Sequence, residues 1–176
     1  MSAGPRHKVP FRRRREGTTD YRARLKLLKG GRPRAVVRLT GGRVVVALTE
    51  YDPLGDRVLA AAESRELQAI GFPPRSIGST PGSYLTGYLA GLRAKAAGTT
   101  EAVLDVGLRR PARGGRLMGA LKGLLDAGVE IPHGEKGFPG VDRLNGKHLP
   151  TPLPKPLESY KGELPGIVVR KKAGGP

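Results

Sequence analysis

Apolar residues between positions 33 and 62 fall in short β-branched runs. Residues 35–39 (Ala-Val-Val-Arg-Leu) and 43–48 (Arg-Val-Val-Val-Ala-Leu) are separated by Gly41-Gly42. Two such runs across a pair of glycines predict a β-hairpin. A dense turn signal at residues 51–56 precedes a third, weaker run over residues 58–62. We therefore expect three antiparallel strands arranged as a meander.

Farther along the chain, the apolar period lengthens to that of a helix. Residues 80–97 carry a continuous apolar stripe, and Thr80 followed by Pro81 has the composition of an N-cap and first helical residue. Gly87 and Gly91 lie four residues apart and leave one edge of this helix without side chains. Glycine inside a helix costs about 1 kcal/mol relative to Ala, so we expect another element to pack closely there.

A short, mostly apolar run at residues 102–106 precedes a second expected helix over about residues 115–127. Such a run is typical of a strand buried at the centre of a sheet. The order strand, strand, strand, helix, strand, helix predicts one α/β (α+β) domain. Its mixed sheet combines the three-stranded antiparallel meander with one central strand, and the two helices pack on it.

This globular core is placed at residues 33–132, and the segment that follows it differs in composition. Residues 133–176 are rich in Pro and Gly, with Pro at every second position from 150 to 156. Such a composition predicts an extended C-terminal tail that lies on a partner rather than forming a core of its own.

Residues 1–32 are predicted to form a basic N-terminal arm that ends in a short helix. Residues 1–19 hold too few apolar side chains to offset their ordering entropy and should be disordered in the free protein. Residues 20–29 instead predict a basic amphipathic helix that Asp20 can cap. Its apolar face would hold Tyr21, Leu25 and Leu28, with Arg22, Lys26 and Lys29 on the other face.

The charge is concentrated at the two ends of the chain. Residues 1–38, 39–108 and 109–176 have net charges of +11, −1 and +7, which account for the total of +17. A surface this basic attracts polyanions and repels copies of itself. A nearly neutral core with basic extensions is the layout of a folded core with polyanion-binding arms, although composition alone does not distinguish RNA, DNA and anionic lipid as the partner.

The sequence also excludes several classes of protein. It has no cysteine, which rules out disulfides and thiolate zinc sites. No apolar run approaches the roughly 18–20 residues that span a bilayer, and the basic N-terminus lacks the apolar segment of a signal peptide. We expect a soluble cytoplasmic protein with no membrane partner. One Asn, one Gln and 16 Pro favour a thermophilic source.

Two basic segments are candidates for contact with nucleic acid. Arg binds phosphate through two hydrogen bonds at once and stacks on unpaired bases, and each neutralised phosphate releases counterions. Four successive Arg beside Phe11, next to a helix with a basic face, therefore favour binding over a merely solvated tail. The second segment, Arg109–Arg116, lies before the start of a helix, where free N–H groups and the helix dipole suit a phosphate. It lacks the Gly-Lys-Ser/Thr and G-x-G-x-x-G patterns of nucleotide loops.

The acidic residues Glu50, Asp52, Asp56 and Asp105 could indicate a two-metal nuclease, in which paired carboxylates hold the ions. However, Asp52 and Asp56 flank a Pro-Leu-Gly turn, where Asp forms local hydrogen bonds. Asp105 could pair with Arg109 or Arg110. A structural role is the better interpretation of all of them.

We therefore predict no catalytic residue, no metal site and no cofactor. The three His, at positions 7, 133 and 148, have no ligand spacing. Residues 78–82 could bind phosphate at a helix start, but their capping chemistry already explains them.

Several segments together resemble one family. They are TDYRARLKLL (19–28), PRAVVRLTGGRVVVAL (33–48), EYDPLGDRVLAAAESREL (50–67), TPGSYLTGYLAGLRA (80–94) and EAVLDVGLRRPARGGRLMGALKGLLDAGVEIPH (101–133). This family is the 5S rRNA-binding ribosomal protein L-eighteen of the large subunit, in its archaeal form, akin to the longer eukaryotic homologue. The resemblance covers residues of about 6–148, and no family motif matches the tail from about residue 150.

The resemblance implies a monomer within the ribosome, in the central protuberance, that binds 5S rRNA and helps attach it to 23S rRNA. A 5S-binding protein of the L-five family would be its neighbour. The basic arm and the face of the sheet would contact 5S rRNA. The predicted RNA-binding residues are Arg6, Lys8, Arg12, Arg13, Arg14, Arg15, Tyr21, Arg22, Arg24, Lys26, Lys29, Arg34, Arg38, Arg109, Arg110, Arg113, Gly114, Gly115 and Arg116. A magnesium-dependent nuclease and a general nucleic-acid-binding protein are the alternatives.

Overall fold

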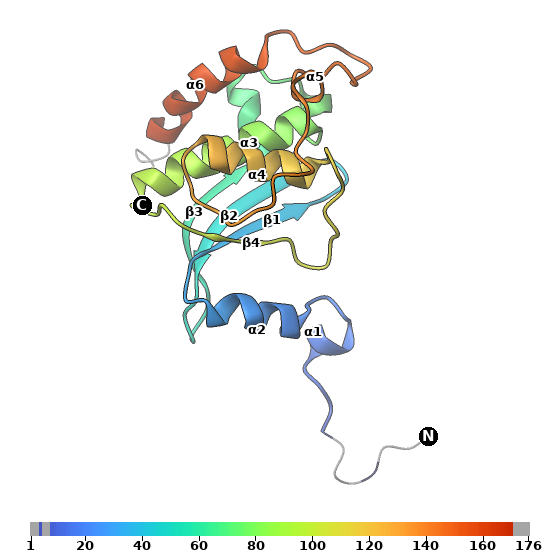
Figure 1. Ribbon diagram of the computed structural model, residues 1–176, viewed down its shortest axis with the longest axis vertical. Coiled ribbons are helices and arrows are strands. Elements are labelled where there is room, and N and C mark those ends of the chain that lie inside the picture. Colours follow the sequence, from blue (N-terminus) through green and yellow to red (C-terminus); the bar gives the residue numbers. More distant parts are fainter. Residues whose placement is uncertain (1–3, 5–7, 171–176) are drawn as a thin grey trace.

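The computed structural model describes residue 4 and residues 8–170 (Figure 1). The elements of this part of the chain, in order, are α1 (Arg12–Arg15), α2 (Tyr21–Lys29), β1 (Arg34–Leu39), β2 (Val44–Glu50), β3 (Arg57–Glu63), the 3-10 helices η1 (Ser64–Ile70) and η2 (Pro74–Ser76), α3 (Thr80–Ala96), β4 (Val103–Asp105), α4 (Arg116–Asp126), α5 (Val141–Leu144) and α6 (Leu157–Arg170).

The four strands form one mixed sheet in the order β3-β2-β1-β4. β1 and β2 are antiparallel, with Val37 opposite Val46, and β2 pairs with β3 in the same sense. At the hairpin between the first two strands, the amide of Thr40 donates to the carbonyl of Arg43 at 2.9 Å. β4 runs parallel to β1. The predicted α+β class, the antiparallel meander and the mixed sheet are therefore confirmed.

The position predicted for the fourth strand is wrong. β4 lies at the edge of the sheet and pairs with β1 alone, with Val36 opposite Asp105. Its apolar residues Val103 and Leu104 are half-buried, and Ala102, just before the strand, is fully buried. Such a composition indicates that the faces of a strand are covered, and it carries no information about how many neighbours the strand has.

The sheet has one face covered by helices and one face turned toward α2 (Figure 1). On β1, Ala35 and Val37 are buried in the core with α3 and α4, whereas Arg34 and Arg38 point to the opposite face. The side chains of a strand alternate between its two faces, so this β-strand places its arginines away from the helices. The same face carries the candidate functional site.

Glycines allow α3 and α4 to pack closely. A Cβ at position 87 would lie 2.1 Å from the carbonyl oxygen of Ala120, and one at position 123 would lie 2.1 Å from the carbonyl oxygen of Tyr84. The prediction of a close neighbour along the glycine edge of α3 is thus confirmed, and α4 is that neighbour. The N-cap of α3 is Ser79 rather than the predicted Thr80, and the hydroxyl of Ser79 accepts from the amide of Gly82.

The C-terminal segment differs from the extended tail that its prolines predicted. Helix α6 packs on the side of α3 that faces away from the sheet (Figure 1). Leu157, Tyr160, Leu164 and Ile167 are buried in the common core. The ring of Tyr160 contacts that of Phe72 edge to face, with centroids 5.2 Å apart. These positions are spaced by three, four and three residues, so the helical period is present in the sequence.

Candidate nucleic-acid interface

Helix α2 is the element that joins the basic arm to the sheet. Oδ1 of Asp20 accepts hydrogen bonds from the amides of Arg22 and Ala23 at 2.9 and 3.0 Å, so the predicted cap is confirmed. Tyr21 and Leu25 are 42% and 56% exposed. Two of the three residues of the predicted apolar stripe are therefore turned to solvent and Leu28 is half-buried, while Arg24 of α2 makes polar contacts toward the sheet.

Those polar contacts belong to a chain of alternating charges that crosses the sheet. Arg24 of α2 binds both carboxylate oxygens of Asp56 at 2.9 Å. Asp56 also binds Arg34, which reaches Asp105 at 2.9 Å. Asp105 accepts a further hydrogen bond from Arg38 at 2.9 Å. The charge network Arg24–Asp56–Arg34–Asp105–Arg38 thus links α2, the loop before β3, β1 and β4.

The two carboxylates of this charge network are held in their ionised form. Burial raises the pKa of Asp105, but hydrogen bonds and charge from Arg38, the amide of Gly107 and Arg34 outweigh this effect, so the net pKa is lowered. In Asp56, burial is likewise outweighed by the hydrogen bonds and charges of Arg24 and Arg34, and its pKa is also lowered. Both carboxylates therefore act as fixed negative charges that orient guanidinium groups.

The buried position of Arg34 changes its predicted role. Its side chain is only 2% exposed, and both of its terminal nitrogens bind carboxylates. An arginine so enclosed cannot also reach an RNA phosphate. Arg34 thus fits a positioning role and does not fit the RNA contact that was predicted for it. The prediction that Asp105 pairs with Arg109 or Arg110 is wrong, because Arg34 and Arg38 take its carboxylate oxygens.

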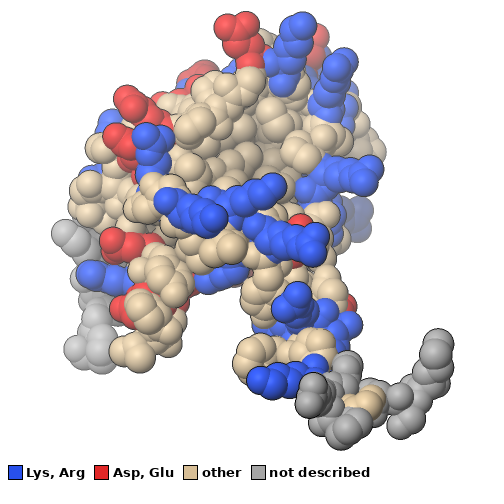
Figure 2. All heavy atoms as spheres, turned by 60° about the horizontal axis from the view of Figure 1, so that its bottom comes forward, with Lys and Arg blue, Asp and Glu red and all other residues tan. Residues whose placement is uncertain are grey.

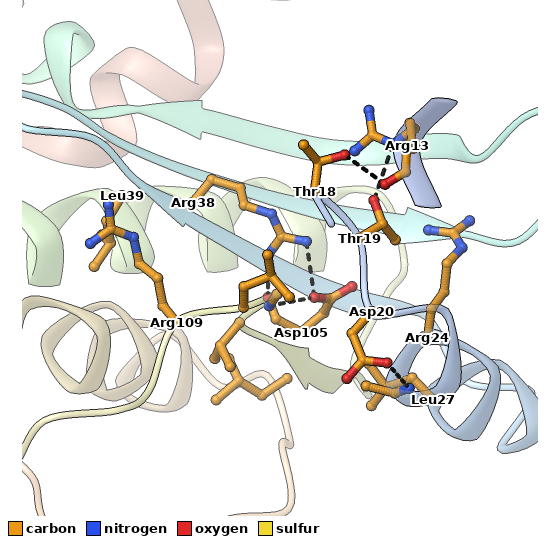
Figure 3. A pocket seen from close by; sticks show the side chains of 15 residues that line it. Arg13, Thr18, Thr19, Asp20, Arg24, Leu27, Arg38, Leu39, Asp105 and Arg109 are labelled. Carbon is orange, nitrogen blue, oxygen red and sulfur yellow. Dashed lines mark hydrogen bonds and ion pairs between the residues drawn. The ribbon is translucent and has the colours of Figure 1, made fainter. Parts of the chain in front are cut away.

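A groove of about 340 Å³ lies between the arm, α2 and the edge of the sheet (Figure 3). We call it the arm groove. Its charged lining residues are Arg13, Asp20, Arg24, Arg38, Asp105 and Arg109. In Figure 3, Arg38 reaches toward Asp105, while Arg13 lies beside Thr18 and Thr19. Nε of Arg13 donates to the hydroxyl of Thr19 at 3.1 Å, a contact within the arm at the side of this groove.

A second concavity of about 380 Å³, which we call the α4 hollow, lies at the start of α4. Four arginines line it, namely Arg109, Arg110, Arg116 and Arg143. Nη1 of Arg116 donates to the carbonyl oxygens of Thr40 at 3.0 Å and Gly78 at 3.1 Å. The start of α4 is thereby tied to the β1–β2 turn and to the loop before α3.

The other predicted contact residues lie mostly at the surface. Arg24 and Arg116 are partly buried. The exposed ones are Lys8, Arg12, Arg13, Arg14, Arg15, Tyr21, Arg22, Lys26, Lys29, Arg38, Arg109, Arg110 and Arg113. Arg6 lies outside the described residues. Figure 2 shows Lys and Arg side chains gathered across the middle of this face and along the arm that projects from it.

Gly114 and Gly115 shape the turn before α4. Gly114 has φ +62°, a conformation that L side chains rarely adopt, and its amide donates to the carbonyl of Gly137 at 2.8 Å. The amide of Gly115 donates to the carbonyl of Ala112. Both amides therefore have protein partners, and the close approach of an RNA backbone at these glycines stays a prediction.

The acidic residues do not form a metal centre within the described part of the chain. There, no three His, Cys, Asp or Glu side chains lie together in a group that could hold an ion. Asp52 accepts from the amide of Leu54 at 2.8 Å, as expected of a turn residue. Among the same residues, no helix has the length and apolar character needed to cross a membrane.

Two features of the site were missed from the sequence. Asp56 was interpreted as a turn residue, and its link to Arg24 could not be found because 32 residues separate the two. Arg143 lies in the segment predicted to be a tail, and no periodicity marks it. The proximity of these residues is created by the fold.

The fold and these surfaces identify the class of protein: it is a basic α+β protein whose arginines gather at one edge of a mixed sheet. A sequence model of the family described as ribosomal large subunit proteins 60S L5 and 50S L18 matches residues 5–100 and 93–134. The chain belongs to this family, and its relatives are structural ribosomal proteins rather than enzymes.

Two archaeal relatives agree with this assignment. The chain is 52% identical to the large ribosomal subunit protein uL18 of Aeropyrum pernix over 150 residues, which are 85% of this chain and 70% of that protein. It is 49% identical to the uL18 protein of Korarchaeum cryptofilum over 149 residues, which are 85% of this chain and 76% of that protein. The predicted family is therefore confirmed, and a structural role in the large ribosomal subunit follows.

Proposed function

We propose that this chain binds 5S rRNA in the large ribosomal subunit and helps attach it to 23S rRNA in the central protuberance. A 5S-binding protein of the L-five family would be a neighbour. The observation that carries the proposal is the arm groove, in which carboxylates hold Arg24 and Arg38 in place and Arg13 of the basic arm lines the side. Membership of the large-subunit family supports the same conclusion.

The charge network gives the groove its affinity for a polyanion. Holding a guanidinium in advance lowers the ordering entropy that is lost when it binds a phosphate. Arg24 and Arg38 each use part of their hydrogen-bonding capacity on Asp56 and Asp105, and they remain about a third and a half exposed. Their remaining N–H groups are available to phosphate oxygens. The network as a whole carries three positive and two negative charges and stays net positive.

RNA fits this surface better than duplex DNA. Sequence-specific proteins recognise RNA mostly in loops and bulges, where aromatic side chains and arginines stack on unpaired bases. Tyr21 and Phe11 are exposed beside the arginines of the arm. Each arginine supplies charge for the backbone, and the aromatic rings offer surfaces for bases.

The proposal is tested by competition. Labelled 5S rRNA from Aeropyrum pernix is bound to the protein at 200 mM salt, and unlabelled 5S rRNA, an unrelated RNA duplex or duplex DNA is added. We expect at least a tenfold preference for 5S rRNA. Equal competition by the unrelated duplexes would contradict the proposal and favour a general nucleic-acid binder. Magnesium-dependent cleavage of the labelled RNA would instead favour a nuclease.

A further inference from the structure

The arm groove and the α4 hollow are adjacent, and two residues line both of them. Leu39, at the end of β1, and Arg109, in the loop after β4, form the boundary between the two concavities. The groove lies on the α2 side of the sheet, and the hollow lies beside Thr80 at the start of α3. A ligand that leaves the groove past Arg109 therefore enters the hollow directly.

The two concavities differ in how their arginines are neutralised. In the arm groove, Arg24 and Arg38 form ion pairs with Asp56 and Asp105. The α4 hollow has no Asp or Glu among its lining residues. Within the described part of the chain, Arg110 and Arg143 form no ion pair. Positive charge therefore converges in the hollow without a protein counterion, which raises the local concentration of anions.

The arginines of the hollow come from separate segments that the fold holds together. Arg116 is fixed by carbonyl oxygens of the β1–β2 turn and the loop before α3. Arg143 belongs to α5, which is anchored by the buried Leu144. The stem of Arg143 passes close to Gly114, with its Cδ 3.6 Å from the place where a Cβ would lie. The arrangement is therefore built by tertiary structure and is not a run of like charges along one segment.

The positive charge of Arg143 affects the nearby His148. Partial burial, and then the positive charge of Arg143, lower the pKa of His148.

We propose that one continuous RNA segment runs from the arm groove past Arg109 into the α4 hollow, where Arg110 and Arg143 bind its backbone phosphates. This inference rests on the proposed binding of 5S rRNA and deepens it. It adds Arg143, which lies beyond the residues 5–134 matched by the family's sequence model. The segment after residue 133 thus contributes to RNA binding as well as to the core.

The test compares two double variants that each lose two positive charges. Arg110→Gln/Arg143→Gln removes exposed side chains of the hollow. The control, Arg65→Gln/Lys95→Gln, removes exposed charges near the far end of α3, since Lys95 lies 15 residues beyond Thr80, about 22 Å at the rise of a helix. Affinity for 5S rRNA from Aeropyrum pernix is measured between 50 and 400 mM salt, and melting temperatures verify that both variants fold.

We expect the hollow variant to bind more weakly at low salt by about a hundredfold or more, as the loss of two charge-assisted hydrogen bonds implies. The slope of log K against log salt should fall by about 1.4 to 1.8, because each phosphate contributes about 0.7 to 0.9. The control should keep the wild-type slope. If the hollow variant matches the control while the wild type still prefers 5S rRNA, the inference is wrong and the proposed function stands. If the wild type shows no such preference, the proposed function itself fails.

Hydroxyl-radical footprints test whether the segment is continuous. Nucleotides that lose protection in Arg110→Gln/Arg143→Gln should directly adjoin, in the RNA sequence, those that lose protection when Arg13 is replaced by Gln. Loss of protection in a strand remote from the second set would overturn the single-segment path.

Discussion

Nη1 of Arg34 lies 2.9 Å from Oδ2 of Asp105, and both side chains are almost fully enclosed between β1, β4 and the loop before β3. The desolvation of two buried charges offsets most of their mutual attraction, so such a pair contributes little net stability. The pair instead determines the positions of neighbouring side chains. Asp105 also holds Arg38, and Arg34 also holds Asp56, which in turn binds Arg24 of α2. One buried pair therefore fixes two arginines of the arm groove.

Replacing Asp105 with Asn should destabilise the protein, because it removes one of the two carboxylates that neutralise the buried Arg34. We expect the free energy of unfolding, measured in urea, to fall by about 3 kcal/mol. The matched control is Asp142→Asn, since Asp142 pairs with Lys147 but is 76% exposed. An exposed pair contributes about 0 to 1 kcal/mol. Similar losses in the two variants would show that Asp105 has no special role.

Asp105 should also make the stability of the protein depend on pH. The pKa of Asp105 is lower in the folded protein than its ordinary value, so ionisation of this group stabilises the fold. This contribution is fully present above the unfolded pKa of about 3.9 and is lost as the pH falls through the lower, folded value. The stability gap between wild type and Asp105→Asn should therefore be constant from pH 7 to about pH 5 and narrow below about pH 4. Urea titrations at a series of pH values measure it, and a gap that widens on acidification would reverse the assigned sign.

Close packing of α3 on α4 should make Gly87 and Gly123 intolerant of any side chain. A Cβ at either position would lie 2.1 Å from a backbone carbonyl oxygen, which cannot rotate away. Gly87→Ala and Gly123→Ala should each cost about 3 kcal/mol or more. Gly162→Ala in α6, where no atom lies within 4 Å of the added carbon, should be neutral or stabilise by up to about 1 kcal/mol. Thermal melts that fail to separate the two groups would contradict the packing.

The C-terminal helix should behave as part of the core. Leu164 is fully buried in α6. Its replacement by Ala should lower the free energy of unfolding by about 2 to 4 kcal/mol, as for other buried leucines. Ser159→Ala, at an exposed position of the same helix, serves as the control. A loss of less than about 0.5 kcal/mol for Leu164→Ala would restore the prediction of an extended tail.

Local patterns account for the parts of the fold that the sequence predicted well. Gly41-Gly42 between two β-branched runs determines the β1–β2 hairpin, and Asp20 alone indicates where α2 begins. The glycine edge of α3 also indicated a close neighbour. Each of these signals lies within a few residues of the feature that it predicts.

Features that depend on tertiary contacts were not predicted. The family resemblance placed Arg34 among the RNA-binding residues, but its partners Asp56 and Asp105 lie 22 and 71 residues away. In α6, the spacing of Leu157, Tyr160 and Leu164 is helical, but the prolines at 150–156 and Pro165 obscured it. Pro can occupy the first turn of a helix, and α6 also accommodates one in its interior.

The account's central claim is that the basic arm and the groove beneath it bind 5S rRNA. Helix α1 has no buried residue, so replacing Arg12–Arg15 with Ala should leave the melting temperature of the core unchanged. The most direct test is the affinity of the wild type and this variant for 5S rRNA as a function of salt. We predict weaker binding and a slope of log K against log salt that is smaller by up to about 3, because as many as four phosphate contacts are lost. An unchanged slope and affinity would contradict the claim, and a large fall in melting temperature would show instead that the arm is part of the folded core.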